Sequence, residues 1–251
     1  MKVVIIEGMD NTGKTTVIHG LMEKYNNVLY MHATKPKEID PIKCAIEQKK
    51  YFHHMVESIK NVEQSRFNVD LIILDRSWLG EYVYGCLYRG NGDDYVKDMI
   101  SECYDHLSRI GAGWYNLDFS TILYTASPEF CAKNDDGNSI SEGRVEAIKK
   151  EGERFEEIIK SNIVIGKKGI INVENDGKFL SKEDILEMTL NIINDHREVN
   201  NIGMLYIQGI REELLNEPEE EEVDETEDLT TDVNDNGGEE REEEENDEEE
   251  A

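Results

Sequence analysis

The chain has 251 residues and a formal net charge of −29, of which −20 falls in residues 217–251 and −9 in the other 216 residues. Its four cysteines are scattered without a C-x-x-C pair, which argues against a disulfide framework or a zinc site, and no apolar run approaches the ~20 residues that a membrane-spanning helix needs. The first residues lack the length and flanks of a signal peptide, so we expect a cytoplasmic protein whose body can bury one full hydrophobic core.

Short apolar runs rich in β-branched residues predict five strands, and the first of them, KVVII, has the composition of a strand buried on both faces of a sheet. The runs are residues 2–6, 27–31, 69–74, 121–125 and 169–173. Apolar residues at helical spacing predict helices between the strands. They cover residues 17–22, 42–64, 78–88, 96–110, 144–160 and 181–193, and a short helix opens at Ser127-Pro128. Alternating strands and helices form βαβ units, so we expect an α/β fold with a doubly wound parallel sheet.

The first predicted strand leads into a glycine-rich turn that matches the phosphate-binding pattern G-x-x-x-x-G-K-[ST]. Glycines let successive backbone N–H groups point at phosphates, and the following helix adds the positive end of its dipole. Lys14 is predicted to reach the β- and γ-phosphates and the Thr15 hydroxyl to ligate Mg²⁺. The turn therefore predicts ATP and Mg²⁺ as cofactors on a P-loop NTPase fold. The predicted nucleotide-binding residues are Gly8, Asn11, Thr12, Gly13, Lys14, Thr15 and Thr16.

A second motif closes the third predicted strand. Asp75 stands at the carboxyl end of this strand, where open α/β sheets bind ligands, and is predicted to hold Mg²⁺. The neighbouring Arg76 is a candidate bidentate clamp for phosphate oxygens. Two interpretations remain open for Asp10, which either shapes the turn as an Asx residue or lies near the acceptor phosphate. Tyr84, on the next predicted helix, is either a core residue or a platform for a base.

Together these motifs resemble the thymidylate kinase family over about residues 1–196. Residues 7–16 look like that family's E-G-x-[DE]-x-x-G-K-[ST]-[ST] loop, and Asp75-Arg76 followed by Tyr84 is similar to its D-R-[YH] segment with a downstream A-Y-Q. Ser127-Pro128-Glu129 resembles the D-P-E turn that follows the fourth strand, and Arg144 looks like part of the lid region.

The resemblance implies transfer of the γ-phosphoryl group of ATP to a deoxynucleoside monophosphate, either thymidine monophosphate or a related or modified pyrimidine nucleotide. It further implies that Asp10 and Arg76 organise the acceptor phosphate and that Arg144 neutralises charge on the transferring group, so that with Lys14 these residues are the catalytic set. Relatives of this kind dimerise through helices, which implies a homodimer. The implied substrate-binding residues are Asp10, Lys35, Phe52, Arg76 and Tyr84.

Two departures from the family pattern bear on the acceptor. Val56 stands where the family has an arginine that reads the thymine edge. Ser77 after Asp75-Arg76 gives the D-R-S pattern of deoxynucleoside kinases, so a nucleoside 5′-hydroxyl stays open as the acceptor. Such an acceptor needs a general base, for which Glu7 and Asp75 are the candidates, whereas a phosphate acceptor needs none.

Residues 217–251 hold 21 acidic residues and no apolar periodicity, which predicts a disordered acidic tail. We expect a kinase domain over residues 1–211 and a tail over residues 212–251. The tail is either a solvated extension or a segment that engages a basic partner by charge. In the second case, a non-catalytic nucleotide-binding protein is the alternative from another functional class. The mildly acidic body argues against a nucleic-acid substrate and favours a small nucleotide.

Overall fold

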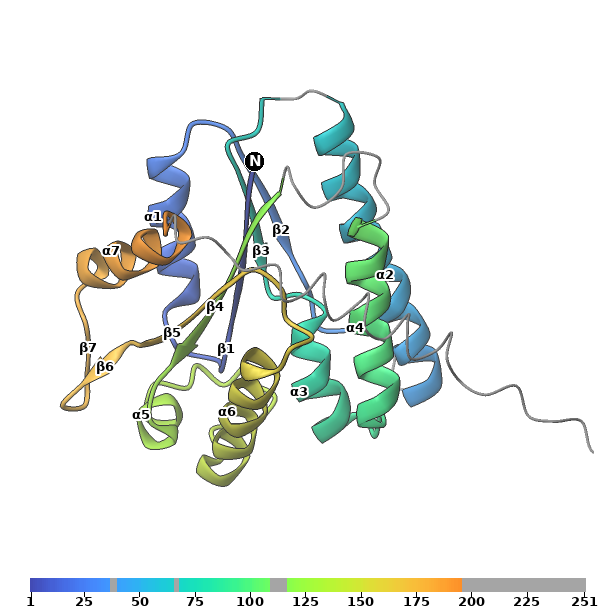
Figure 1. The fold of residues 1–251 in the computed structure, drawn as a ribbon. Coiled ribbons are helices and arrows are strands. Elements are labelled where there is room, and N and C mark those ends of the chain that lie inside the picture. The colour runs from blue at the N-terminus through green and yellow to red at the C-terminus, as the bar shows by residue number, and fades with distance from the viewer. Residues whose placement is uncertain (37–39, 66–67, 109–116, 196–251) are drawn as a thin grey trace, which may run out of the picture.

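The computed structural model describes residues 1–36, 40–65, 68–108 and 117–195. Its centre is a parallel five-stranded sheet with the strand order β2-β3-β1-β4-β5 (Figure 1). The strands are β1 (Lys2–Gly8), β2 (Val28–His32), β3 (Leu71–Asp75), β4 (Asp118–Thr125) and β5 (Lys167–Asn172). This architecture confirms the predicted doubly wound α/β fold with five parallel strands.

Helices cover both faces of the sheet (Figure 1). They are α1 (Lys14–Lys24), α2 (Pro41–Gln64), α3 (Leu79–Tyr88), α4 (Asp93–Ser108), α5 (Pro128–Lys133), α6 (Val145–Lys160) and α7 (Lys182–Ile193). Alternate residues of β1 point to opposite faces, as the pleat of a strand requires. Val4 and Ile6 pack in the core under α1 and α7, whereas Val3 and Ile5 belong to the larger core that contains residues of α2, α3, α4 and α6.

Side-chain caps fix where three of the helices begin. Asp40 accepts hydrogen bonds from the backbone N–H groups of Ile42 and Lys43 at 3.0 Å, with a proline at the first turn of α2. Ser127 and Ser181 cap α5 and α7, which confirms both predicted helix openings. Each such cap typically contributes about 1 kcal/mol to helix stability.

The register of the sheet brings the carboxyl ends of its central strands together. Asp75 at the end of β3 pairs with Ile6 of β1 on one side and with His32 of β2 on the other. Gly8 at the end of β1 pairs with Tyr124 of β4, and a Cβ on this glycine would lie 2.3 Å from the Tyr124 carbonyl oxygen. The turn after β1 therefore needs glycine at this position, and it opens onto the sheet edge where α/β proteins bind ligands.

A small antiparallel hairpin, β6 (Glu174–Asn175) with β7 (Lys178–Phe179), was not predicted. Asp176 and Gly177 form its turn with φ angles of 49° and 71°, a conformation typical of a tight hairpin. The Glu174 carboxylate accepts hydrogen bonds from the backbone N–H and the hydroxyl of Ser127, at 2.8 and 2.6 Å. The hairpin is thereby tied to the start of α5.

Strands β4 and β5 begin three and two residues earlier than their apolar runs predicted, at Asp118 and Lys167. The Lys167 ammonium lies 2.8 Å from an Asp118 carboxylate oxygen, so the charged residues that begin the two strands form an ion pair across the sheet.

The predictions for Ile110, residues 202–210 and the tail lie outside the described residues, and the domain boundary stays a prediction. Among the described helices, none is both long and apolar enough to cross a membrane.

Candidate functional site

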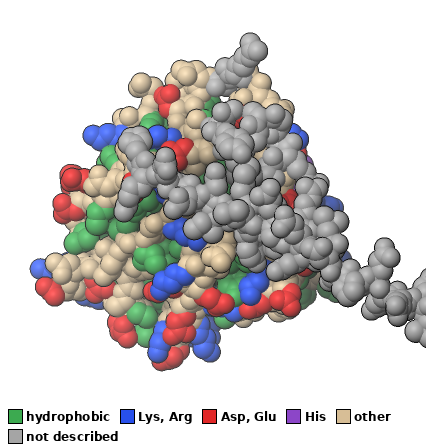
Figure 2. Space-filling model, viewed as in Figure 1, with side chains coloured by type: hydrophobic (Ala, Val, Ile, Leu, Met, Phe, Trp, Pro, Cys, Tyr) green, Lys and Arg blue, Asp and Glu red, His purple; other side chains and the backbone are tan. Residues whose placement is uncertain are grey.

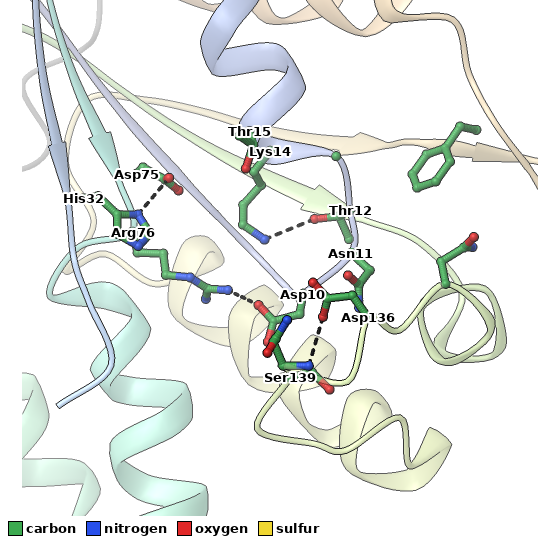
Figure 3. A pocket seen from close by; sticks show the side chains of 14 residues that line it. Asp10, Asn11, Thr12, Lys14, Thr15, His32, Asp75, Arg76, Asp136 and Ser139 are labelled. Carbon is green, nitrogen blue, oxygen red and sulfur yellow. Dashed lines mark hydrogen bonds and ion pairs between the residues drawn. The ribbon is translucent and has the colours of Figure 1, made fainter. Parts of the chain in front are cut away.

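A cavity of about 500 Å³ lies at the carboxyl ends of the sheet strands (Figure 3). Residues of the glycine-rich turn, of the ends of β2 and β3, of the segment after α5 and of the hairpin line it. They are Asp10, Asn11, Thr12, Gly13, Lys14, Thr15, His32, Asp75, Arg76, Asn134, Asp136, Asn138, Ser139 and Phe179. Most of the residues predicted from the two sequence motifs are therefore brought together in one place.

The glycine-rich turn has the backbone shape of a phosphate cradle. Asn11 and Gly13 adopt left-handed conformations with φ angles of 62° and 75°, and the Thr12 hydroxyl donates a 2.9 Å hydrogen bond to the Met9 carbonyl. Gly13 is also the N-cap of α1, so the start of this helix faces the cavity. Backbone N–H groups at a helix start, together with its dipole, favour an anion at this position.

Lys14 extends into the cavity, with its ammonium close to the turn (Figure 3). The Nζ atom donates to the carbonyl oxygens of Gly8 and Met9 at 3.1 and 2.5 Å. Burial lowers the pKa of Lys14 to about 8, and the nearby charge of Arg76 acts in the same direction. A phosphate entering the turn would offer this ammonium a stronger, charged acceptor than the two carbonyls.

Arg76 is held by contacts on both sides. Its backbone adopts φ = 66°, a left-handed conformation that is costly for a residue with a long side chain, and its N–H bonds the Ile6 carbonyl at 2.9 Å. The guanidinium forms an ion pair with Asp10 and donates a 3.0 Å hydrogen bond to the Tyr84 hydroxyl. Asp10 and Tyr84 thus hold the Arg76 guanidinium from two sides, and Tyr84, 7% exposed, does so from the core.

One carboxylate oxygen of Asp75 accepts hydrogen bonds from two side chains of the neighbouring strand β2. Tyr30 Oη donates to Oδ2 at 2.9 Å, and His32 Nδ1 lies 2.8 Å from the same oxygen. Desolvation raises the pKa of Tyr30 to about 12, so its hydroxyl remains a donor. His32 lines the cavity but was not predicted as a site residue from the sequence. The available signal was a polar residue at the carboxyl end of a predicted strand, which is where ligands bind in such sheets.

The segment between α5 and α6 forms another wall of the cavity. Asp135 organises it by accepting hydrogen bonds from the Ser139 hydroxyl at 3.0 Å and from Asn11 Nδ2 at 3.3 Å. Asn134, Asp136, Asn138 and Ser139 line the cavity, and none of them was predicted. Their short polar side chains look like loop residues in the sequence, and the contact between Asp135 and Asn11 of the glycine-rich turn joins distant parts of the chain.

Phe179 of the hairpin stands beside the cradle. The residue is 46% exposed, and its ring packs edge-to-face on Phe130 of α5, with the ring centroids 4.6 Å apart. A Cβ added at Gly13 would lie 3.8 Å from Phe179 Cε1. The exposed ring is therefore a surface on which a planar base could stack. The Asp176-Gly177 pair was the sequence signal for this hairpin.

Comparisons with known proteins agree with this geometry at the level of the fold. No protein-family model matches the chain, and no curated protein matches it. A solved thymidylate kinase from Candida albicans is 14% identical and has a TM-score of 0.53, covering 76% of this chain and 90% of that chain. The chain has the fold of the thymidylate kinase-like P-loop kinases. A deoxyadenosine kinase from M. mycoides is also similar, with 18% identity, 77% and 99% coverage and a TM-score of 0.44.

Some residues implied by the resemblance to this kinase family do not reach the cavity. Phe52 is 2% exposed in the hydrophobic core, together with the buried Val56, so its ring has no face open to a base. Lys35 is exposed and does not line the cavity. Tyr84 does not line the cavity either. Gly8 and Thr16, which were predicted from the glycine-rich turn, are also not part of the lining.

Arg144 is the N-cap residue of α6 and lies on a separate cavity of about 290 Å³ with Leu87 and Tyr88. Its Nε donates to the Ser141 carbonyl at 3.0 Å. Arg144 is not among the residues that line the cavity beside the glycine-rich turn. Its lid role therefore stays a prediction.

Glu7, one candidate base for a nucleoside acceptor, does not line the cavity. Its side chain is fully buried, and Oε1 accepts hydrogen bonds from the Ser77 N–H and hydroxyl at 2.8 and 2.7 Å. Burial raises the pKa of Glu7 to about 7, although the Ser77 hydrogen bonds oppose that rise. Since Glu7 does not line the cavity, Asp75 is the candidate base that the structure places within it.

The residues at the cation position fit a magnesium ion. Oδ1 of Asp75 receives no hydrogen bond from the described residues, and the exposed Thr15 hydroxyl lines the same cavity. A carboxylate and a hydroxyl oxygen are the hard donors that Mg²⁺ prefers, usually with several water ligands retained.

Proposed function

We propose that this chain transfers the γ-phosphoryl group of ATP to a deoxynucleoside monophosphate, as a kinase of the thymidylate kinase-like type. The proposal rests on one observation. Lys14 of the glycine-rich turn and the Arg76 guanidinium line the same cavity, so a triphosphate and a second phosphate can be bound side by side. Phosphoryl transfer depends mainly on such positioning and on neutralising charge.

In the proposed reaction, the turn and Lys14 bind the β- and γ-phosphates, and Phe179 offers its exposed ring to the adenine. Arg76, oriented by Asp10, positions the acceptor phosphate. An acceptor phosphate oxygen forms a bond to the γ-phosphorus as the bond from that phosphorus to the β-bridging oxygen breaks, which gives ADP and a nucleoside diphosphate. Thr15 and Asp75 would hold Mg²⁺, whose charge stabilises the phosphates during transfer.

One face of the molecule supports a small acceptor. On the face shown in Figure 2, Lys and Arg side chains alternate with Asp and Glu side chains. A protein that binds a nucleic-acid backbone typically presents a continuous basic stripe instead.

The second candidate function is phosphorylation of a nucleoside 5′-hydroxyl. The observation in its favour is that Asp75, followed by Arg76 and Ser77, lies in the cavity and could remove the proton of a hydroxyl. A non-catalytic nucleotide-binding protein whose acidic tail engages a basic partner is the alternative from another class, and the tail lies outside the described residues.

The deciding experiment measures ADP release from Mg·ATP with each nucleoside, each nucleoside monophosphate and a DNA oligonucleotide as acceptor. We expect turnover with at least one pyrimidine deoxynucleoside monophosphate and none with nucleosides. Turnover with nucleosides alone, with a rate that collapses in Asp75→Asn and shifts with pH, would replace the proposal by the second candidate. Silence for all acceptors with retained ATP affinity would favour the non-catalytic class.

A further inference from the structure

Strand β2 carries two hydrogen-bond donors that meet on one carboxylate. Tyr30 and His32 are two residues apart, so their side chains lie on the same face of the strand. Tyr30 Oη and His32 Nδ1 lie 2.9 and 2.8 Å from Asp75 Oδ2. The sheet register places His32 directly opposite Asp75, which makes the shorter contact a cross-strand pair at the edge of the cavity (Figure 3).

This arrangement leaves the two oxygens of Asp75 in different situations. Oδ2 accepts both donors, whereas Oδ1 receives no hydrogen bond from the described residues. Asp75 is 5% exposed, and that exposure is at the cavity. Two donors on one oxygen restrict rotation of the carboxylate group, so Oδ1 is held in one orientation.

The donors are themselves held in place. The Tyr51 hydroxyl of α2 donates to the His32 carbonyl at 2.6 Å, and the Ala33 N–H donates to the Asp75 carbonyl at 3.0 Å. The rings of Tyr30 and His32 stack at a centroid distance of 6.5 Å with 19° between their planes. The backbone of His32 is therefore anchored to α2, while its side chain, 43% exposed at the cavity, contacts Asp75 and the ring of Tyr30.

We propose that His32 and Tyr30 are positioning residues that aim Asp75 Oδ1 at the divalent cation accompanying ATP. This inference rests on the proposed nucleotide site, because it assigns a cation to Asp75. Groups that hydrogen-bond a metal ligand orient it, and their loss typically weakens metal affinity about 10- to 100-fold. His32 lies directly opposite Asp75 in the sheet and makes the shorter contact, so we expect its loss to have the larger effect.

The test uses Mn²⁺ as a paramagnetic substitute for Mg²⁺. The full-length protein is titrated with Mn²⁺ at saturating ATP, and unbound Mn²⁺ is quantified by electron paramagnetic resonance. We expect His32→Ala to weaken Mn²⁺ affinity in the ATP complex by about tenfold or more and Tyr30→Phe to weaken it less. ATP affinity measured in EDTA should stay at the wild-type value in both variants, and thermal unfolding confirms that each variant is folded.

Two amide variants separate the role of Nδ1 from general packing. The amide nitrogen of asparagine can lie near the position of Nδ1, whereas that of glutamine extends toward the position of Nε2. We therefore expect His32→Asn to recover most of the Mn²⁺ affinity and His32→Gln to recover little. Equal behaviour of the two variants would contradict an orienting role for the contact with Asp75.

A double variant tests whether His32 acts through Asp75. In an Asp75→Asn background, the further change His32→Ala should leave Mn²⁺ affinity unchanged, because coupled residues are non-additive. An undiminished effect in that background, or an equal loss of ATP affinity in EDTA, would show that His32 contacts the nucleotide directly and would overturn the inference. These binding measurements need no acceptor, so they remain informative even if the acceptor panel finds no turnover.

Discussion

Individual residues of the cradle combine burial with charge, and Lys14 shows the consequence most clearly. Its ammonium is held by two backbone carbonyls in a buried position, and burial lowers its pKa to about 8. A bound phosphate stabilises the charged form, so ATP binding above this pH must be accompanied by proton uptake.

We therefore expect the dissociation constant for ATP to rise roughly tenfold per pH unit above pH 8, as one linked proton requires. Isothermal titration calorimetry between about pH 7 and pH 9.5 measures this dependence. Lys14→Arg is the matched control, because a guanidinium keeps its charge over this range. An equally steep dependence in the arginine variant would show that another group takes up the proton.

Glu151 of α6 is a second buried ionisable residue. It is 1% exposed, its Oε1 accepts a 2.5 Å hydrogen bond from the Tyr88 hydroxyl, and burial raises its pKa from 4.5 to about 7. The folded state therefore holds a proton that the unfolded state releases at lower pH. Between these two values, the contribution of this group to stability falls as pH rises.

Glu151→Gln should remove that dependence. The quantity of interest is the free energy of unfolding of the variant minus that of the wild type. We expect this difference to increase by on the order of 2–3 kcal/mol between about pH 5 and pH 8. Urea denaturation at both pH values measures the difference. Glu153→Gln, at an exposed position on the same helix, is the control and should show no such change. A pH-independent difference for Glu151→Gln would contradict the raised pKa.

At the scale of elements, the junction between β1 and the glycine-rich turn is the most constrained. Gly8 has φ = 141°, and a Cβ there would lie 2.3 Å from the Tyr124 carbonyl oxygen of β4. We expect Gly8→Ala to destabilise the fold by more than about 1 kcal/mol and to weaken ATP binding, because the end of β1 must move away from β4 to make room for the methyl group. Gly92→Ala, where no atom lies within 4 Å, is the matched control and should leave both quantities nearly unchanged.

The hairpin formed by β6 and β7 is expected to bind the base of ATP through Phe179. Stacking of a base on an aromatic ring typically contributes about 1–3 kcal/mol, so Phe179→Ala should weaken ATP binding about tenfold or more. Affinity for inorganic triphosphate, which has no base, should not change. Ile170→Ala, an exposed apolar residue of β5, is the control. Equal losses for ATP and triphosphate would mean that the hairpin supports the cradle instead.

The elements also show what local sequence can predict. The turn between β1 and α1 was predictable because its glycines, Lys14 and Thr15 act within eight consecutive residues. The helix starts at Ser127 and Ser181 were predictable for the same reason, since a cap bonds a backbone group two or three residues away.

The remaining parts of the site depend on contacts between distant segments. His32 and Asp75 are 43 residues apart and meet only through the register of β2 and β3. Asp135 reaches Asn11 across 124 residues. The resemblance to the kinase family implies that Phe52 stacks on a base, yet it is packed in the core because α2 turns that face inward. Spacing along the chain does not contain this information.

For the whole molecule, the sheet order places β1 between β3 and β4, so the cradle after β1 lies next to the Asp75-Arg76 end of β3. One cavity can therefore contact both a triphosphate and an acceptor phosphate. The acidic tail, the homodimer and the cytoplasmic location remain predictions from sequence and resemblance.

The most direct test of the account follows the γ-phosphoryl group itself. ATP labelled with ³²P at the γ-phosphate is incubated with Mg²⁺ and pyrimidine deoxynucleoside monophosphates, and the products are separated chromatographically. We predict that the label appears in a nucleoside diphosphate with the wild-type chain and stays in ATP with Lys14→Ala. Label that remains in ATP with every acceptor, or that is released only as inorganic phosphate, would contradict the proposed transfer.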